Sequence, residues 1–344
     1  MKNIKNKLHI VYYEWPNTAG NHAGMAHLFR FLHSQHKNQI KLIQIPTLLP
    51  RKNKYIQKLY LYVLTTYFYL FTRRVFLTEY LGNASGNQTW IADRLRKWKW
   101  SGKLLGLVHL SEKHLSELYN TELIPYDLYV SKKIELLDKV LVFGSSLANF
   151  FIRLGHKDKV VLTYHYVDTS YYHPLPNAQT NSRLQVIAMG SLKRNYADLE
   201  YIVKQLPEID FNICVGNKDI GNLFTNTNNA KIYRFIPESE LLSLMQNSDV
   251  SISVLEDTIG SNVITTSMAC GLAQIVSDVG SIRDYLDDSN SILCNELESF
   301  VVALIKLNED RNYLSSLKRN AIQKIDRITL NTFDAWFSTE ILEK

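Results

Sequence analysis

A short turn of small residues in the second half of the chain has the composition of an anion site. Gly260-Ser261-Asn262 follows a strand-like run at 250–255 and opens a helix-like run at 262–270. The first amides of a helix have no partner within the helix and lie at its positive end, so such a start suits a diphosphate. Gly260 lets the backbone approach closely, and Ser261 or Asn262 can cap the helix. The alternative is an ordinary strand-to-helix turn with a capping residue.

Two basic residues follow the first strand-like run of the same half. Lys193 and Arg194 come after 184–189, a run that ends at Gly190. A guanidinium binds phosphate with two parallel donors, and a lysine adds a point charge that offsets the charge of a leaving diphosphate. Arg194 is the stronger candidate. The alternative for both residues is a solvated basic turn.

In the first half, His109 stands directly after the strand-like run Leu104-Leu105-Gly106-Leu107-Val108. A histidine at the carboxyl end of a strand can donate a hydrogen bond to a substrate or transfer a proton. The alternative is a partly buried structural histidine. The loop around Gly20-Asn21-His22, between the first strand and an amphipathic helix, is weaker because any strand-to-helix turn contains such residues.

The elements that must position these residues alternate between strand and helix periodicity, which predicts parallel sheets covered by helices. In the first half we expect strands at 8–13, 40–46, 74–79, 103–108, 139–143 and 159–163, and helices at 22–35, 55–72, 87–98, 112–119 and 146–154. In the second half we expect strands at 184–189, 211–215, 231–235, 250–255 and 273–277, helices at 196–206, 238–247 and 262–270, and two or three helices in 296–342.

The alternation is interrupted by a loop that contains Pro174, Pro176, Asn177, Thr180, Asn181 and Ser182. We therefore expect a domain at 1–170, a second at 184–328 and a C-terminal helix at 329–344 that returns to the first. Two open α/β sheets in tandem would bind a ligand between the carboxyl ends of their strands.

Composition agrees with two globular domains and argues against other classes. The chain has 344 residues, of which 46% are hydrophobic and 21% charged, so intrinsic disorder is excluded. Its three cysteines, Cys214, Cys270 and Cys294, have no paired spacing, which argues against a disulfide framework or a zinc site. The apolar run Leu8–Tyr13 near the N-terminus is too short for a signal peptide, and we expect a cytoplasmic protein.

Three segments of the second half resemble a retaining nucleotide-sugar glycosyltransferase of the GT-B type, in the large group 1 family. The segment 238–255 is similar to the family's helix, "small-Asp" turn and strand, and 260–280 is similar to its donor-binding helix and the strand after it. Gly190-Ser191-Leu192-Lys193-Arg194-Asn195-Tyr196 stands where family members place basic residues on the donor diphosphate. The likeness covers 184–290, while the N-terminal half is similar in layout alone.

The resemblance implies a GT-B fold, in which two Rossmann-like domains face each other across a cleft. It implies donor contacts from Gly190, Lys193, Arg194, Thr258, Gly260, Ser261, Asn262, Val263 and Thr266. It implies that His109 lies close to the transferred sugar and that Gly20, Asn21 and His22 face the acceptor. It also implies retention at the anomeric carbon and no metal or other cofactor, and no Asp-x-Asp metal motif is visible at a strand end.

The sequence departs from the family at two positions. Family members carry two glutamates eight positions apart around the donor turn, and Thr258 and Thr266 stand in their places. A hydroxyl can bond a sugar or a ribose but lacks the charge-assisted strength of a carboxylate. Glu256 or Asp257 could replace the first glutamate from a shifted register.

A basic, aromatic stretch occupies residues 51–100. It holds two acids, Glu79 and Asp93, against ten cations: Arg51, Lys52, Lys54, Lys58, Arg73, Arg74, Arg94, Arg96, Lys97 and Lys99. The apolar core at 59–71 is shorter than the about 20 residues that span a bilayer, which favours a helix lying on an anionic membrane surface. A buried helix with charged ends is the alternative. Nucleic acid is not expected, because no nucleic-acid fold signature accompanies the stretch.

These observations predict a glycosyltransferase that moves a sugar from a nucleotide-diphosphate sugar to a glycan or lipid-linked acceptor, as in bacterial surface polysaccharide or lipopolysaccharide synthesis. We expect it in the cytoplasm, peripheral on the inner face of the membrane. A sugar-nucleotide epimerase would need a pair of acid/base carboxylates, and no convincing pair is visible. A GT-B protein that binds a nucleotide or glycan without catalysis is the other alternative, supported by the two missing glutamates.

Overall fold

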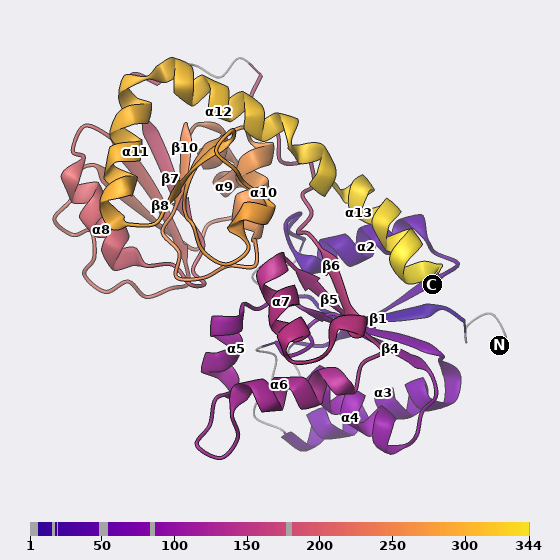
Figure 1. Cartoon of the computed structure of the whole chain (residues 1–344). Coiled ribbons are helices and arrows are strands. Elements are labelled where there is room, and N and C mark those ends of the chain that lie inside the picture. The colour runs from indigo at the N-terminus through magenta and orange to yellow at the C-terminus, as the bar shows by residue number, and fades with distance from the viewer. Residues whose placement is uncertain are drawn as a thin grey trace. The chain divides into compact units, whose positions relative to one another are not determined.

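The computed structural model places most of the chain in two compact units. The described residues are 6–15, 18, 20–47, 54–82, 87–176 and 181–343. One unit comprises Met1–Tyr164 and Phe333–Lys344, and the other comprises His165–Thr332. Each is a parallel sheet with helices on its faces (Figure 1). The predicted α/β class with two Rossmann-like domains is confirmed.

Among its described residues, the first unit has a six-stranded sheet in the order β2-β1-β3-β4-β5-β6. The strands are β1 (Leu8–Tyr13), β2 (Ile40–Ile45), β3 (Arg74–Leu77), β4 (Lys103–Val108), β5 (Lys139–Phe143) and β6 (Val160–Thr163). All neighbours are parallel. The central strands are largely apolar and buried along almost their whole length, because helices cover both faces of the sheet.

The helices of this unit are α2 (Met25–Gln35), α3 (Lys54–Phe71), α4 (Asn87–Lys97), α5 (Glu112–Tyr119), α6 (Tyr126–Glu135), α7 (Ser145–Arg153) and the end of α13 (Leu330–Phe337), with a 3₁₀ turn at Lys157–Lys159 and a π-helical turn at Ser338–Leu342. The ring of Phe76 in β3 lies 5.7 Å from that of Phe29 in α2 and 6.1 Å from that of Phe337 in α13. His9 of β1 points to the other face, where its ring lies 6.4 Å from Phe68 of α3.

The second unit has, within the described residues, a six-stranded parallel sheet in the order β12-β11-β10-β7-β8-β9. The strands are β7 (Gln185–Met189), β8 (Asp210–Gly216), β9 (Ala230–Arg234), β10 (Val250–Ser253), β11 (Ala273–Ser277) and β12 (Ser291–Cys294). The helices are α8 (Tyr196–Gln205), α9 (Glu238–Gln246), α10 (Asn262–Ala269), α11 (Leu297–Glu309) and α12 (Arg311–Gln323), with 3₁₀ turns at Ile282–Asp284 and Ile325–Ile328.

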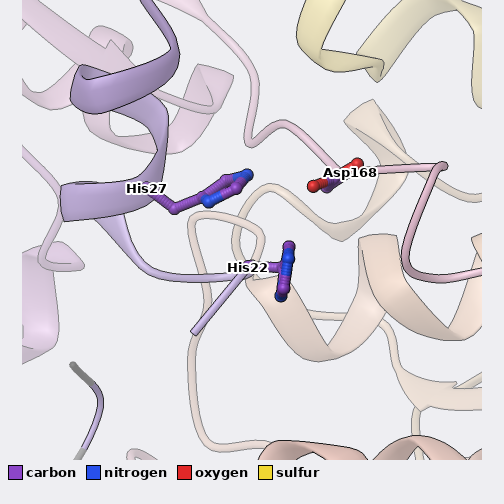
Figure 2. A group of neighbouring side chains, drawn as sticks. All are labelled: His22, His27 and Asp168. Carbon is purple, nitrogen blue, oxygen red and sulfur yellow. The ribbon is translucent and has the colours of Figure 1, made fainter. Parts of the chain in front are cut away.

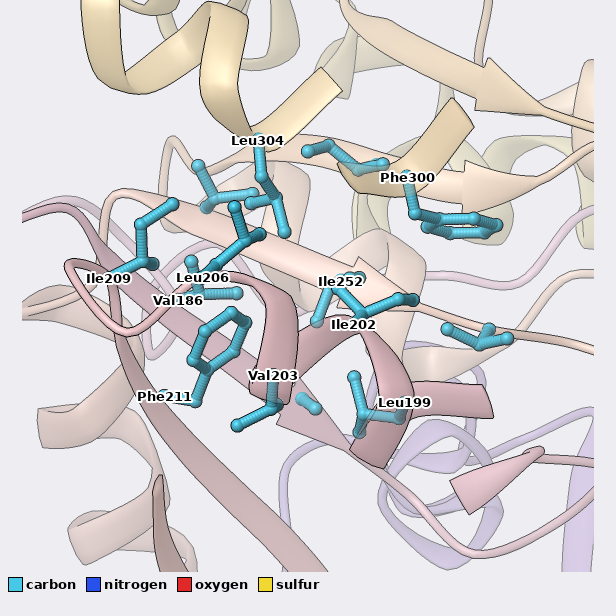
Figure 3. Packing of buried hydrophobic residues seen from close by; sticks show 14 of the residues in the cluster. Val186, Leu199, Ile202, Val203, Leu206, Ile209, Phe211, Ile252, Phe300 and Leu304 are labelled. Atoms are coloured by element: carbon cyan, nitrogen blue, oxygen red, sulfur yellow. The ribbon is translucent and has the colours of Figure 1, made fainter. Parts of the chain in front are cut away.

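One face of this second sheet is covered by a continuous apolar core. Val186, Phe211 and Ile252, from three neighbouring strands, pack against Ile202 of α8 and Leu304 of α11 (Figure 3). Each is at most 2% exposed, and burying a side chain of this size contributes about 1.5–3 kcal/mol. This core holds the sheet rigid, so the loops at its carboxyl edge have a fixed base.

The two units meet along the chain between Tyr164 and His165, before the predicted loop at 171–183. The segment that follows is already tied to the second unit, because the Val167 amide donates to the Ile328 carbonyl at 2.8 Å and the Tyr172 hydroxyl to Glu238 at 2.6 Å. Two residues of the predicted loop, Asn177 and Thr180, lie outside the described residues.

The C-terminal residues belong to the first unit from Phe333 onward. His36 of α2 lies 2.8 Å from the Asp334 carboxylate, and Arg74 donates to the Leu342 carbonyl at 3.0 Å. The chain therefore passes from the second unit back to the first within α13.

Two elements were not expected from the sequence, and one begins later than expected. Helix α6 was missed because only Val130 and Ile134 of its ten residues are buried, which leaves little periodicity. Strand β12 was missed because it is a four-residue edge strand. The helix expected at 22–35 starts at Met25, because a turn precedes it in which the Gly24 amide donates to the Asn21 carbonyl.

Helix α3 carries large apolar side chains on its exposed side as well as on its buried side. Its inner residues Leu61, Thr65 and Phe68 are buried against the sheet, whereas Leu59 and Val63 are 64% and 60% exposed. The alternative of a fully buried helix at 59–71 is therefore wrong for its outer half. No helix of the described residues is both long and apolar enough to cross a membrane.

Candidate active site

The predicted donor residues gather at the point where the strand order of the second sheet reverses. From β7 the chain proceeds to β8 and β9 on one side, and β10, β11 and β12 lie on the other. The loops after β7 and β10 therefore diverge in opposite directions, and open α/β sheets bind ligands at such a switch point. Backbone bonds join the two loops: the Asn195 amide donates to the Val254 carbonyl at 3.0 Å, and the Glu256 amide to the Lys193 carbonyl at 3.1 Å.

Arg194 is a cation without an anionic partner at this switch point. Its Nε donates to the Met189 carbonyl at 3.0 Å and its Nη1 to the Leu192 carbonyl at 3.3 Å. Among the described residues no carboxylate pairs with it, and burial lowers the pKa of Arg194 to about 10. The group remains charged at neutral pH. Arg194 is partly buried, and removing a charge from water without a counterion is unfavourable, a cost that an anionic ligand would offset.

The backbone around Arg194 is held in conformations that favour glycine. Gly190 has φ +91°, and a Cβ there would lie 3.4 Å from both the Arg194 guanidinium and a Val263 methyl group. Gly190 therefore lies between the Arg194 guanidinium and the first turn of α10, and a side chain at this position would touch both. Lys193 has φ +53°, a left-handed conformation that costs a non-glycine residue about 1–2 kcal/mol. Such strain is typical of functional turns.

Helix α10 begins with an unused hydroxyl. Ser261 is its N-cap, but the side chain makes no cap hydrogen bond, and its Oγ is buried without a partner among the described residues. A serine in this position normally accepts from a backbone amide of the first turn. A buried, unpaired hydroxyl beside the positive end of a helix is instead suited to a phosphate oxygen.

The turn before α10 tolerates no side chain at Gly260. Its φ is +90°, and a Cβ would lie 2.2 Å from the ring of Tyr285, which is fully buried. The tyrosine hydroxyl accepts from the His165 amide at 2.9 Å, so the ring is fixed from a second side. The start of α10 is therefore held in place by packing before any ligand binds.

Thr258 and Thr266, at the positions of the family glutamates, are both engaged locally. The Thr258 Oγ1 accepts from the Gly260 amide at 3.0 Å, and the Thr266 Oγ1 donates to the Asn262 carbonyl at 2.6 Å. Both residues are buried. With its proton committed, the Thr266 hydroxyl can offer a ligand only a lone pair. Glu256 is exposed on the same loop, and the Asp257 carboxylate accepts from the Thr258 amide at 2.8 Å.

In the first unit, His109 lies beside a carboxylate that the sequence did not single out. Its Nε2 is 3.5 Å from the Glu79 Oε2, and the two side chains are 24% and 13% exposed. They follow β4 and β3, which are neighbours in the sheet. The His109 Nδ1 is buried and has no partner among the described residues. A carboxylate at this distance can orient the imidazole ring.

Glu79 could have been found from one signal: it is an acid placed directly after a strand, in a stretch of cations. Its amide donates to Gln88 of α4 at 2.8 Å, and Gln88 donates to the Val11 carbonyl of β1 at 3.2 Å. Strands β1 and β3 flank the reversal of strand order in this sheet. The first unit therefore also places its ionisable groups at the switch point.

The predicted acceptor loop, Gly20-Asn21-His22, follows β1 at that same edge. The Asn21 amide donates to the Thr18 carbonyl at 3.1 Å, which folds the loop into a turn. The rings of His22 and His27 lie 4.8 Å apart with an interplanar angle of 52°. Figure 2 shows both side chains. Two imidazoles at the start of α2 form a polar surface that can exchange protons with a hydroxyl-bearing ligand.

Other features of the second unit do not contribute to this site. A polar cavity of about 490 Å³ lies near Lys204, Asp210 and Asn229, at the amino ends of the strands, and is partly occupied by an ion pair of Arg183 with Asp210 at 3.0 Å. The three cysteines are free and buried, and burial raises the pKa of Cys214 and Cys270 to about 12. Thiols with such pKa values are not nucleophiles at neutral pH.

Residues 183–310 match the protein-family model "Glycosyl transferases group 1". The matched segment lies within the second unit and contains every predicted donor residue. No curated protein shows significant sequence similarity to the chain.

The whole chain resembles solved glycosyltransferase structures. Sucrose-phosphate synthase from Thermosynechococcus elongatus superposes with a TM-score of 0.77 at 12% identity, over 97% of this chain and 98% of that one. The fold is GT-B. Anabaena HepE in complex with UDP and glucose gives a TM-score of 0.73 at 13% identity, over 98% of this chain and 100% of that one.

A third GT-B structure, the lipopolysaccharide outer core galactosyltransferase WaaB, gives a TM-score of 0.70 at 12% identity over 98% of this chain and 99% of that one. At these identities the likeness establishes the GT-B fold and leaves donor, acceptor and stereochemistry open. The segment of this GT-B chain that the family model matches includes Arg194 and the start of α10.

Proposed function

We propose that the chain is a glycosyltransferase that moves a sugar from a nucleotide-diphosphate sugar to a glycan or lipid-linked acceptor, with retention at the anomeric carbon. The observation that carries the proposal is the partly buried Arg194 guanidinium, which has no carboxylate partner among the described residues. It lies near the start of α10, where the Ser261 hydroxyl has no partner among the described residues. Together they offer a dianion a cation, a helix start and a hydrogen-bond donor.

In this proposal Arg194 and Lys193 neutralise the charge that develops on the diphosphate as the glycosidic bond breaks. Ser261, Asn262 and Val263 bind phosphate oxygens through the start of α10. Protein groups alone provide this positive charge, and the proposal invokes no metal ion or cofactor. Thr258 and Thr266 hold the turn and the helix, and Thr266 offers an acceptor to a ribose hydroxyl.

His109 and the loop Gly20-Asn21-His22 serve the transferred sugar and the acceptor. His109, held by Glu79, donates a hydrogen bond to the sugar and orients it for attack. The HepE structures hold UDP, and WaaB acts on lipopolysaccharide outer core. By analogy we propose a uridine nucleotide as the first donor to test, and an acceptor of the bacterial cell surface assembled at the inner face of the membrane.

The first experiment is a calorimetric titration of the protein with uridine, guanosine and thymidine diphosphates. We expect one of them to bind, and to bind less tightly to Arg194→Ala than to wild type. Donor hydrolysis by wild type, followed by NMR of the released sugar, then reports turnover and anomeric configuration. If none of the three diphosphates binds the folded protein, the proposed donor site is wrong.

A binding protein without catalysis is the second candidate, because both threonines at the glutamate positions use their hydroxyl groups within the chain. The same titration separates the two candidates when it is combined with the hydrolysis assay. Nucleotide binding without donor hydrolysis or transfer to any glycan acceptor would favour this second candidate.

A further inference from the structure

The outer face of α3 is mostly apolar and is exposed to solvent. We define this face by Tyr55, Leu59, Tyr62, Val63, Tyr69 and Leu70, all of which are exposed. Three tyrosines recur at intervals of seven residues, so they form one stripe along the helix, with the aliphatic side chains beside it. Surface helices of soluble proteins normally place polar residues on their outer side. An apolar outer face therefore indicates a partner.

A tryptophan from the next helical segment extends this face. The ring of Trp98, which follows α4, lies 5.5 Å from that of Tyr62 and 5.8 Å from that of Tyr69, edge to face in both cases. Trp98 remains partly exposed, whereas Trp100 is buried. The contacts fix α3 and the end of α4 as one surface that carries aromatic rings with polar tips.

Cations surround the surface without acids to balance them. Lys58, Arg73, Lys97 and Lys99 are exposed around it. In residues 54–103 the only acids are Glu79 and Asp93, and both have partners: Glu79 lies beside His109, and Asp93 accepts from Lys133 at 2.6 Å. Among the described residues of 54–103, the exposed charged side chains near the apolar surface, which form its rim, are therefore all basic.

We infer that the outer face of α3, together with Trp98 and this basic rim, docks the protein on an anionic lipid surface. Tyrosine and tryptophan rings with an apolar body and a polar tip favour the headgroup region, where lysine and arginine meet lipid phosphates. The helix would lie in the plane of the interface with Leu59 and Val63 toward the acyl chains, as interfacial amphipathic helices do.

Charge argues against a second copy of the chain as the partner. In a two-fold symmetric dimer the same patch meets itself, so the two basic rims would face each other. Like charges at close range oppose such association. An anionic membrane instead supplies the missing negative charge. The inference deepens the proposed function, because it places the protein where a lipid-linked acceptor is found, but binding to lipid is measured without any turnover.

The test is vesicle flotation of the full chain. We expect it to float with vesicles of phosphatidylcholine and phosphatidylglycerol, and not with phosphatidylcholine alone. Binding should weaken from about 0.01 M to about 1 M salt, as the screening length falls from about 30 Å to about 3 Å. Each cation near an anionic surface contributes about fivefold to partitioning. Lys58→Glu with Lys97→Glu should therefore lower partitioning by about 25-fold or more.

The apolar contribution is tested by Leu59→Asn with Val63→Asn. Both positions are exposed, so the substitutions leave the core intact while the affinity for anionic vesicles falls. Matched controls lie in the second unit: Lys231→Glu with Lys306→Glu for charge, and Val302→Asn with Ile305→Asn for exposed apolar residues on α11. The controls should float like wild type.

The inference would be overturned if wild type did not float with anionic vesicles at low salt, or if the control variants lost as much vesicle binding as the test variants. It would also be overturned by a lipid-free dimer in sedimentation that Leu59→Asn with Val63→Asn dissociates. The last result would assign the surface to a second copy. Nucleotide titration of the same preparations separates this inference from the proposed function. Intact nucleotide binding without flotation refutes the surface alone, and flotation without nucleotide binding refutes the donor site alone.

Discussion

The two units place their candidate residues at equivalent positions but build them from different materials. In the second unit the site after β7 and β10 consists of backbone amides, two glycines at φ near +90° and one partly buried arginine. In the first unit the groups after β1, β3 and β4 are ionisable side chains, of which His109 and Glu79 remain partly exposed.

This difference suggests that the second unit binds the part of the substrates that is constant, and the first unit the parts that vary. A diphosphate is the same in every nucleotide-sugar donor, so a rigid backbone cradle can be complementary to it before binding, and little conformational entropy is lost. A sugar and an acceptor vary in their hydroxyl groups, and side chains adapt to them more readily. The backbone after β7 and β10 should then be rigid, and the ionisable side chains of the first unit should affect turnover.

The largest effect is expected at Gly260. In Gly260→Ala the new methyl group would overlap the buried Tyr285 ring, and the residue would keep a left-handed backbone. Overpacking and the backbone cost together should lower the free energy of unfolding by about 3 kcal/mol or more, measured by urea denaturation. Gly216→Ala is the control, because Gly216 has φ +59° but open space around it, and should cost only about 1–2 kcal/mol. Equal losses would mean that the cradle is not held by Tyr285.

Arg194→Ala should weaken nucleoside-diphosphate binding by about 1.5–3 kcal/mol, or roughly 10- to 150-fold, because a hydrogen bond to a charged group is lost. Calorimetry gives the affinity, and circular dichroism shows that the fold remains. The control is Arg183→Ala, which removes an exposed guanidinium that already pairs with Asp210. Unchanged affinity in Arg194→Ala would exclude Arg194 as a diphosphate ligand.

His109→Ala should lower turnover about tenfold with little change in donor affinity, since its contact is with the sugar rather than with the diphosphate. Glu79→Gln should give a smaller loss, because the carboxylate that lies 3.5 Å from His109 Nε2 and orients the ring is replaced by an amide. His173→Ala, at an exposed position in the second unit, is the control. Wild-type turnover in His109→Ala would return His109 to a structural role.

The smallest expected effect is that of Ser261→Ala, and it separates a ligand contact from an ordinary helix cap most clearly. Because its hydroxyl has no partner, Ser261→Ala should not lower the free energy of unfolding, yet nucleotide affinity should fall by about 1 kcal/mol. Asn195 is the matched N-cap of α8, and its side chain accepts from the Asp198 amide at 3.1 Å. Asn195→Ala should therefore cost about 1 kcal/mol of stability. A similar stability loss in both variants would identify Ser261 as an ordinary cap.

Much of the scaffold was predictable from local pattern. The strands at 8–13, 103–108, 139–143 and 273–277 have the bounds expected from their apolar runs, because buried parallel strands are continuously hydrophobic. The basic turn at Arg194 and the start of α10 at Asn262 were also predictable, because small and charged residues end such apolar runs.

What the sequence determined about this protein is therefore the succession of elements, the two α/β sheets and the residue types at the carboxyl ends of their strands, because these depend on periodicity and turn chemistry within a few residues. Tertiary structure alone decided which of those residues meet. It brought Glu79 to His109 across neighbouring strands and divided α3 into a buried and an exposed face. Among the described residues it left Arg194 without a carboxylate and Ser261 without an amide. Pairing and burial depend on residues far apart in the chain, and no local pattern encodes them.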